Sequence, residues 1–233
     1  MNKTFIAAIC GLALVFCSSK PQKVVILGDS YSTFEGLIPE GYACWYFSDE
    51  RGNDVHSADS TWWKILCADE GYDLLLNSSF SGSTICNRGY NGLDYTAVSF
   101  VTRMKRDIAT EDGSVPLCRR TPDLILIFGG TNDSWSGAPA GEVLPRDKWR
   151  EADLYQCLPA TSYMLGYLTE KLPKARIVMI LNSELRNEIT DGLEEASRVY
   201  GVESIRLKDI DKIGGHPSKK GMKAIAAQLE GIL

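Results

Sequence analysis

The sequence predicts a three-layer α/β domain in which helices cover both faces of a parallel sheet. Two observations lead to this fold class. Short apolar runs alternate with longer stretches of helical periodicity along most of the chain. Several of these runs are continuously apolar, which is typical of strands that are buried on both faces of a parallel sheet. Parallel strands joined through helices have right-handed crossovers, so we expect a helical layer on each side.

Five apolar runs are expected to form the strands. The first, third and fourth read KVVILG, DLILIFG and RIVMILN, and they are the most continuously apolar. Long irregular stretches follow the first three strands, and loops at the carboxyl ends of parallel strands form the binding site in open α/β sheets. The expected strands are residues 23–28, 72–78, 123–129, 176–182 and 202–207.

Apolar residues recur at helical spacing between these strands. Helices are expected over residues 154–172 and 185–200, and shorter ones over residues 60–70 and 94–108. Ser218 is a candidate N-cap for a last helix. The buried face of that helix would carry Met222, Ile225, Ala226, Leu229 and Ile232.

Length, composition and charge are those of one globular domain. The chain has 233 residues, of which 44% are hydrophobic, so one sizeable core can form. The formal net charge is −5. Because a mildly acidic protein is repelled by phosphate groups, neither nucleic acid nor an anionic membrane surface is expected as a partner.

Residues 1–19 are expected to be a signal peptide, followed by the folded domain at residues 20–233. Lys3 precedes an apolar run that ends at Phe16, and small residues that suit a signal peptidase come next. The run is too short to span a membrane. One alternative is a lipoprotein signal with a lipid anchor on Cys17, and another is a buried N-terminal strand or helix. Export predicts a protein that is periplasmic or anchored to the outer membrane.

Cysteine and histidine usage argues against a metal site. In an oxidising compartment the cysteines outside the expected leader allow up to two disulfides and one free thiol. No pair has C-x-x-C spacing, and His56 and His216 are the only histidines of the chain, so a structural zinc site is not expected. The cysteines beyond the leader are Cys44, Cys67, Cys86, Cys118 and Cys157.

Four short motifs carry groups that can do chemistry. Gly28-Asp29-Ser30 closes the first strand, and a serine at a strand-to-helix turn is exposed near the positive end of a helix. Gly82 follows the second strand and lets a backbone N–H approach a ligand closely. Asn132 follows the third strand and offers a side-chain amide. His216 precedes the last helix and is the candidate general base.

Each motif has an ordinary explanation when it is taken alone, because Gly, Asp, Asn and Ser are common turn residues. Their order is more specific than any single motif. A serine, two sources of hydrogen bonds for an oxyanion and a histidine are the parts that nucleophilic catalysis by serine requires.

In this order the motifs resemble the SGNH (GDSL-like) hydrolase family, which is named for its Ser, Gly, Asn and His. The resemblance covers residues 24–233. It implies a flavodoxin-like sheet of five parallel strands in the order 2-1-3-4-5. It also implies that Ser30 is the nucleophile and His216 the base, and that Gly82 N–H, Ser30 N–H and the Asn132 side chain form the oxyanion hole. No metal or organic cofactor is needed for this chemistry.

The sequence departs from the family pattern just before the histidine. The family places an aspartate three residues upstream, and here that residue is Ile213. Two glycines that follow suggest a lengthened, flexible loop that brings Asp211 back to His216, so Asp211 is the expected third catalytic residue. The alternatives are Asp209, Glu184, or a backbone carbonyl that would leave a Ser–His dyad. A smaller departure is a tyrosine in place of the leucine of the GDSL name.

Aromatic residues in the loops suggest the substrate class. Flat aromatic faces suit stacking on sugar rings, so Trp135 is expected to contact the substrate, with Asp29 beside it. Exported bacterial members of the family suggest the deacetylation of glycans. The sequence therefore predicts a serine esterase for short-chain (acetyl) esters on carbohydrates. The alternatives are a lysophospholipase or thioesterase that acts on lipid acyl groups, and a non-catalytic glycan-binding protein on a degenerate hydrolase fold.

Overall fold

A parallel sheet of five strands forms the centre of the molecule. The computed structural model describes residues 20–49, 52–145 and 148–233. The strands lie in the order β2-β1-β3-β4-β5, and every neighbouring pair is parallel. The predicted fold class and strand order are therefore confirmed, and each strand begins and ends within one residue of its expected bounds. The strands are β1 (Lys23–Gly28), β2 (Asp73–Ser79), β3 (Leu124–Phe128), β4 (Arg176–Leu181) and β5 (Glu203–Arg206).

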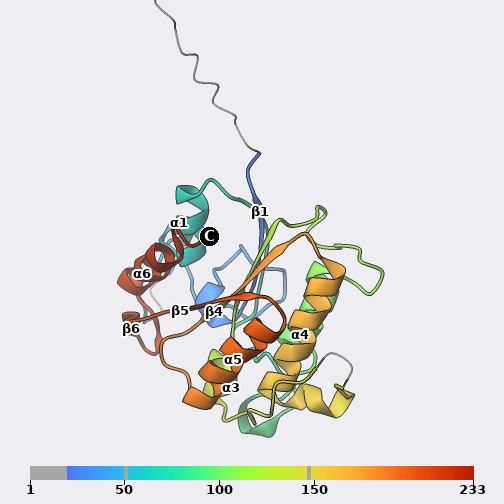
Figure 1. Ribbon diagram of the computed structural model, residues 1–233. Coiled ribbons are helices and arrows are strands. Elements are labelled where there is room, and N and C mark those ends of the chain that lie inside the picture. Colours follow the sequence, from blue (N-terminus) through green and yellow to red (C-terminus); the bar gives the residue numbers. More distant parts are fainter. Residues whose placement is uncertain (1–19, 50–51, 146–147) are drawn as a thin grey trace, which may run out of the picture.

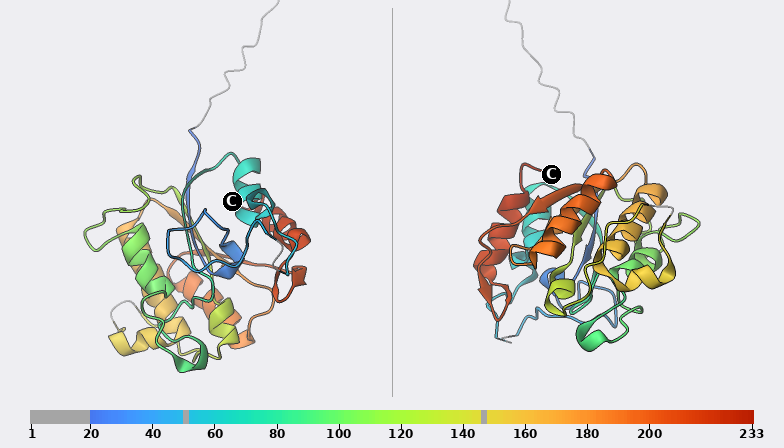
Figure 2. Two further views of the ribbon diagram at one scale, coloured as in Figure 1. Left: turned by 180° about the vertical axis from the view of Figure 1, so that it is seen from behind. Right: turned by 60° about the horizontal axis from the view of Figure 1, so that its bottom comes forward.

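Helices cover both faces of this sheet (Figures 1 and 2). On one face, α1 (Trp62–Asp69) packs beside α6 (Lys219–Leu229). On the other face, α4 (Cys157–Lys171) lies between α2 (Phe100–Arg103) and α5 (Asn187–Val199). The order of the strands places β1 and β3 at the centre, so the turns that follow them lie side by side.

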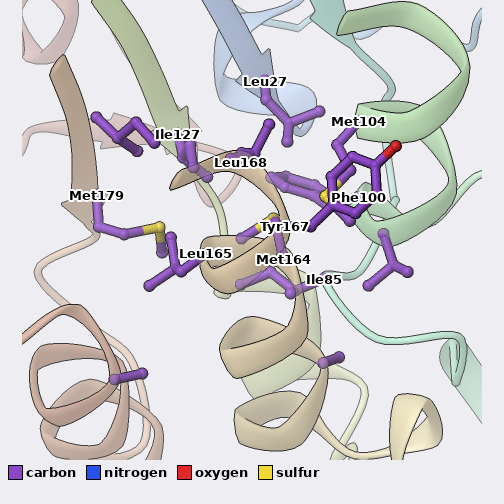
Figure 3. Close-up of a cluster of buried hydrophobic side chains, with 14 of the residues drawn as sticks. Leu27, Ile85, Phe100, Met104, Ile127, Met164, Leu165, Tyr167, Leu168 and Met179 are labelled. Atoms are coloured by element: carbon purple, nitrogen blue, oxygen red, sulfur yellow. The ribbon is translucent and has the colours of Figure 1, made fainter. Parts of the chain in front are cut away.

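Alternate strand residues supply the two halves of the core. Val24 and Ile26 of β1 point to the layer of α1 and α6, whereas Val25 and Leu27 point to the layer of α4. Period-two alternation of this kind, with both sets buried, explains why the strands read as continuously apolar. Figure 3 shows the second half, where strand residues meet side chains of α2, of α4 and of the turn that follows α2: Leu27, Ile127, Met179, Phe100, Met104, Met164, Leu165 and Leu168.

One expected helix is much shorter than predicted. Residues 94–99 form turns, and helical structure begins only at Phe100 and continues as the π-helical turn η4 (Met104–Ile108). Asp94 accepts hydrogen bonds from the backbone N–H and the hydroxyl of Thr96, which favours a turn over a helix start. Ser99 then caps α2 through Thr102 N–H.

Shorter elements shape the carboxyl edge of the sheet. A two-stranded hairpin, β6 (Lys212–Ile213) and β7 (His216–Pro217), precedes α6, and Ser218 caps α6 as predicted, by accepting from Gly221 N–H at 3.1 Å. The remaining elements are α3 (Thr131–Trp135), η1 (Ser30–Ser32), η2 (Ala58–Ser60), η3 (Tyr90–Gly92) and η5 (Glu151–Tyr155).

The expected signal peptide and the candidate lipid anchor Cys17 lie outside the described residues. No helix among the described residues is long and apolar enough to cross a membrane. The cysteines beyond the expected leader are all free thiols in the structure, and burial raises the pKa of those at positions 86, 118 and 157.

Candidate active site

Ser30 lies in the turn that closes β1, at the carboxyl edge of the sheet. At Gly28 an added Cβ would lie 2.5 Å from the hydroxyl oxygen of Ser79, so the strand ends at a residue that must lack a side chain. Asp29 accepts a hydrogen bond from Tyr31 N–H at 3.0 Å and thereby starts η1. The turn carries the Ser30 hydroxyl past the end of the strand.

His216 is held on a tight hairpin. Ile213 of β6 pairs with His216 of β7, and the two glycines between them, Gly214 and Gly215, have φ of 59° and 79°. A two-residue hairpin turn of type I′ needs positive φ at both central residues, which glycine adopts without strain. The prediction of a lengthened, flexible loop is therefore corrected, because these glycines serve to close a short turn.

The histidine and the serine are in contact. His216 Nε2 lies 2.9 Å from Ser30 Oγ, and Nδ1 lies 3.2 Å from the backbone oxygen of Gly214. A carbonyl oxygen can only accept a hydrogen bond, so Nδ1 carries the proton and Nε2 presents its lone pair to the serine hydroxyl. This is the tautomer that a general base for the serine requires.

No carboxylate among the described residues contacts His216. The Asp211 carboxylate accepts a hydrogen bond from the Ser218 hydroxyl, so it supports the start of α6 instead. Glu184 pairs with Lys212 at 2.9 Å, and Asp209 is exposed. The expected contact of Asp211 with the histidine is thus not formed, and the geometry corresponds to the alternative in which a backbone carbonyl faces the ring.

The three candidate oxyanion donors lie on neighbouring segments. Gly82 has a φ of 83°, which suits glycine. In the described part of the chain, neither Ser30 N–H nor Gly82 N–H donates to a backbone oxygen. Asn132 of α3 donates one amide hydrogen to the backbone oxygen of Ser83 at 3.0 Å, and an amide nitrogen carries two. All three groups therefore retain an N–H for a ligand.

Tyr90 fixes the orientation of the Asn132 amide. Its hydroxyl donates to Asn132 Oδ1 at 2.8 Å, while Ser83 O lies on the nitrogen side, so only one orientation of the amide satisfies both neighbours. The loop that carries Tyr90 is closed by a 2.7 Å hydrogen bond from Tyr95 N–H to Asn87 O. No sequence motif points to Tyr90, because a single tyrosine in a polar loop has no distinguishing pattern.

Two tyrosine hydroxyls hold the hairpin on either side of His216. Tyr31 donates to Gly215 O at 2.6 Å, and Tyr46 donates to Pro217 O at 2.8 Å. Tyr31 is the residue that replaces the leucine of the GDSL name. This replacement is the feature of the sequence that could have pointed to a tyrosine hydroxyl at the site. The hydroxyl that leucine lacks connects the serine turn to the histidine hairpin.

Aromatic rings also enclose the imidazole itself. The ring of Trp45 stacks on His216 with the centroids 3.6 Å apart and an angle of 10° between the planes. Tyr31, Tyr46 and Trp135 approach at angles of 60° to 81°. Burial lowers the pKa of His216 to about 4; the hydrogen bond to the backbone opposes this change, and the charge of Lys212 adds to it. The imidazole is consequently neutral at pH 7.

The two residues expected to bind substrate differ in position. Asp29 is fully buried beneath the serine turn, which does not favour the expected contact with substrate. Burial raises the pKa of Asp29 to about 7, against the opposing effects of its bond from Tyr31 N–H and of the Arg103 charge. Trp135 is 42% exposed and lies edge-on to His216, 6.0 Å between ring centroids. Its contact with substrate stays a prediction.

A buried arginine joins the segments that carry the candidate donors. Arg103 of α2 donates to Gly28 O and to Ser83 Oγ, each at 2.9 Å, and also to Ser78 O. These bonds tie the end of β1 to the loop around Gly82. Sequence reasoning missed Arg103, because arginine on an expected helix is normally a solvated residue. No group of three or more His, Cys, Asp or Glu side chains in the described residues is placed to hold a metal.

The family profile described as GDSL-like Lipase/Acylhydrolase matches residues 22–233. The chain belongs to this family. Its motif residues Ser30, Gly82, Asn132 and His216 all lie within the matched range, so the family resemblance seen in the sequence is confirmed. A comparison of this GDSL-like hydrolase with curated proteins finds no match.

Among solved structures, the GDSL-like hydrolase does have similar proteins, and they agree with the family assignment. It is 48% identical to a protein from Bacteroides uniformis described as a GDSL-like lipase, with a TM-score of 0.81 over 90% of this chain and 93% of that one. A protein of the same description from Bacteroides ovatus is 39% identical, with a TM-score of 0.83 over 92% and 98%. An acetyl xylan esterase from Butyrivibrio proteoclasticus shares the fold at 20% identity, with a TM-score of 0.56 over 89% and 62%.

Proposed function

We propose that this GDSL-like hydrolase is a serine esterase that removes short acyl groups, acetyl above all, from carbohydrates. The observation that carries the proposal is the 2.9 Å contact between Ser30 Oγ and an unprotonated His216 Nε2. A serine so placed, beside backbone and amide N–H groups that retain a free hydrogen, is equipped for attack on an ester carbonyl.

Acylation is the first half of the reaction. His216 takes the hydroxyl proton through Nε2 while Ser30 Oγ attacks the carbonyl carbon, and the imidazole becomes positively charged. The oxyanion that forms accepts hydrogen bonds from Ser30 N–H, Gly82 N–H and Asn132 Nδ2. Collapse of the tetrahedral intermediate breaks the ester bond, and His216 gives its proton to the departing alcohol.

Deacylation repeats these steps with water. His216 takes a proton from water as the water oxygen attacks the acyl-serine, and the same three donors hold the second oxyanion. The acid leaves, and the proton returns to Ser30 Oγ. The Gly214 carbonyl keeps the proton of Nδ1 in place throughout, so Nε2 alone exchanges protons.

The carbohydrate part of the proposal rests on the rim of the site and on a shared fold. Trp135 is 42% exposed and contacts the ring of His216 edge-on, so an aromatic surface borders the reacting groups. Such surfaces stack on the apolar faces of sugars. A protein of the same fold is an acetyl xylan esterase, so this fold can carry the removal of acetyl groups from a glycan.

A series of 4-nitrophenyl esters from acetate to octanoate tests the proposal. We expect the highest kcat/KM for acetate, together with release of acetate from acetylated xylan. A rise in kcat/KM towards octanoate would instead support the lipid alternative. Binding of glycans without hydrolysis of any ester would support the non-catalytic alternative.

Ser30→Ala is the matched control. The hydroxyl of Ser30 bonds to His216 and to no other described side chain, so its loss should leave the fold intact. Hydrolysis should fall by about 10⁴ or more, as for other serine nucleophiles. A variant that keeps more than about a tenth of the rate would show that another group attacks the ester.

A further inference from the structure

The charge that His216 acquires during the reaction has no carboxylate beside it. In serine hydrolases with a third, acidic residue, that acid both orients the imidazole and stabilises its positive form. Here the Gly214 carbonyl and the two tyrosine hydroxyls account for orientation. They are neutral groups. The hydrogen bond to the Gly214 carbonyl favours the charged imidazole, whereas the nearby Lys212 disfavours a second positive charge. A further group that stabilises the imidazolium would therefore aid the reaction.

The face of Trp45 is placed for this task. Its ring is nearly parallel to the imidazole at 3.6 Å, closer than any other aromatic ring that contacts His216. The backbone of Trp45 is also tied to the serine turn. The backbone N–H of Trp45 donates to Thr33 Oγ1 at 3.0 Å, and Thr33 Oγ1 donates to the backbone oxygen of Ser30 at 3.0 Å. The stack therefore holds the ring of His216 relative to the serine turn itself.

We propose that Trp45 is a positioning residue that takes over the electrostatic part of the missing carboxylate's role. Its π face attracts the imidazolium that forms as Ser30 attacks, and its stack keeps Nε2 directed at Ser30 Oγ. The inference rests on the proposed esterase function and deepens it. A cation–π contact changes the equilibrium between the neutral and the charged imidazole by roughly three- to thirty-fold. This stabilisation is smaller than that from a carboxylate, but it acts in every step in which His216 takes a proton.

The other groups around the imidazole do not compete for this role. The titratable residues that face it are Ser30 and Tyr31 of η1, Tyr46 in the following loop, and Lys212 of β6. Burial raises the pKa of both tyrosines above the ordinary value, so they stay neutral. Lys212 is paired with Glu184, which reduces but does not reverse its repulsion. The indole is the one group stacked on the ring that favours its charged form.

Substitutions at Trp45 distinguish this electrostatic role from simple apolar packing over the imidazole ring. In Trp45→Leu an apolar side chain remains but the π face is lost, so kcat for acetate ester hydrolysis should fall roughly three- to thirty-fold with little change in KM. Trp45→Phe keeps a ring and should lose less. The control is Trp149→Leu, because Trp149 is equally exposed, at 38%, and packs on Tyr163 of α4, away from the serine. That variant should retain the wild-type kcat.

Three kinetic results would overturn the proposal. An unchanged kcat in Trp45→Leu would show that the indole contributes nothing to the proton transfer. A raised KM with an unchanged kcat would show that Trp45 binds substrate instead of supporting the histidine. A fall in kcat for Trp149→Leu of the same size would show that loss of any exposed indole slows this protein.

Proton NMR of the imidazoles tests the stack without using activity. The chain has 2 histidines, so the Hε1 signals of His216 and His56 can be assigned by His56→Gln. The ring current of the indole should shift the His216 signal upfield at pH 7, and Trp45→Leu should abolish this shift. The midpoint of the His216 titration should also fall in Trp45→Leu.

The NMR result distinguishes failure of the inference from failure of the proposed function. The His216 midpoint could fall in Trp45→Leu although the protein hydrolyses no ester. This result would support the effect of the indole on the imidazole and contradict the proposed esterase function. A midpoint that stays unchanged or rises in Trp45→Leu would overturn the inference whatever the activity.

Discussion

Replacing Asp29 with asparagine should stabilise the protein, and the gain should grow as the pH rises. The Asp29 side chain is completely buried. One oxygen accepts a hydrogen bond from Tyr31 N–H, but the other has no hydrogen-bond partner in the described structure. Asparagine keeps an acceptor for Tyr31 N–H and cannot ionise. The substitution therefore removes a buried charge while retaining the bond that forms the turn.

The size of the effect follows from the pKa. Burial raises the pKa of Asp29 from 3.8 to about 7; the bond from Tyr31 N–H and the Arg103 charge oppose this change, and Asp133 adds to it. Between these pH values the folded state holds a proton that the unfolded state has released. Stability therefore falls as the pH rises through this window. A difference of this size corresponds to about 4 kcal/mol in the free energy of unfolding at pH 8.

Urea unfolding at pH 4 and pH 8 measures this effect. The free energy of unfolding of Asp29→Asn minus that of the wild type should be more favourable at pH 8 by up to about 4 kcal/mol, since other titrating groups cancel in the difference. Asp112→Asn is the control with the opposite sign. The exposed Asp112 has its pKa lowered to about 2 by bonds from Thr110 and Ser114, so removal of its charge should not stabilise the protein at pH 8.

A stability difference that is the same at both pH values would refute this reasoning. It would mean that Asp29 has an ordinary pKa, because water or the Arg103 guanidinium stabilises its charged form. A loss of stability at pH 8 in Asp29→Asn would show that the buried carboxylate stabilises the protein, as a favourable ion pair with Arg103 would.

Three further predictions concern activity. Tyr90→Phe should lower kcat about tenfold, the cost of about one well-placed hydrogen bond to Asn132, with KM unchanged; a changed KM alone would place Tyr90 in substrate binding. Asp211→Asn should leave kcat within about threefold and lower thermal stability by about 1 kcal/mol through Ser218; a loss on the order of 10⁴ would restore Asp211 as the acid of a triad. Because the pKa of His216 is lowered to about 4, the neutral base persists above that pH, so kcat/KM should lose half its value only near pH 4; a midpoint at 6.5 in the pH profile would show an ordinary, solvated histidine.

The sheet and the candidate catalytic residues could be predicted because both depend on local sequence. Each strand of the sheet is a short apolar run that ends in turn residues, and parallel strands bring those ends to one edge. Ser30, Gly82 and Asn132 each follow a strand, so topology alone gathers them. The helix expected at residues 94–108 begins only at Phe100, for a local reason as well, since the Asp94 turn competes with helix initiation.

Residues that act across the fold could not be predicted in the same way. Tyr90, Arg103 and Trp45 reach the site from loops and a helix whose paths depend on packing, and no spacing in the sequence links them to it. The error at Asp211 arose from the glycine pair. Two glycines are compatible with a flexible loop or with a tight turn, and the difference depends on the pairing of Ile213 with His216.

Catalysis by this protein is also a measure of complete folding. Ser30 and His216 are 186 positions apart, and the histidine is carried by the last hairpin, just before α6 packs against α1. A chain that has formed its first strands but not docked its C-terminal segment holds Ser30 without its contact to His216. Closing so long a loop is a late and entropically costly event. Recovery of ester hydrolysis during refolding should accordingly follow the final kinetic phase and not the earlier growth of helical circular dichroism.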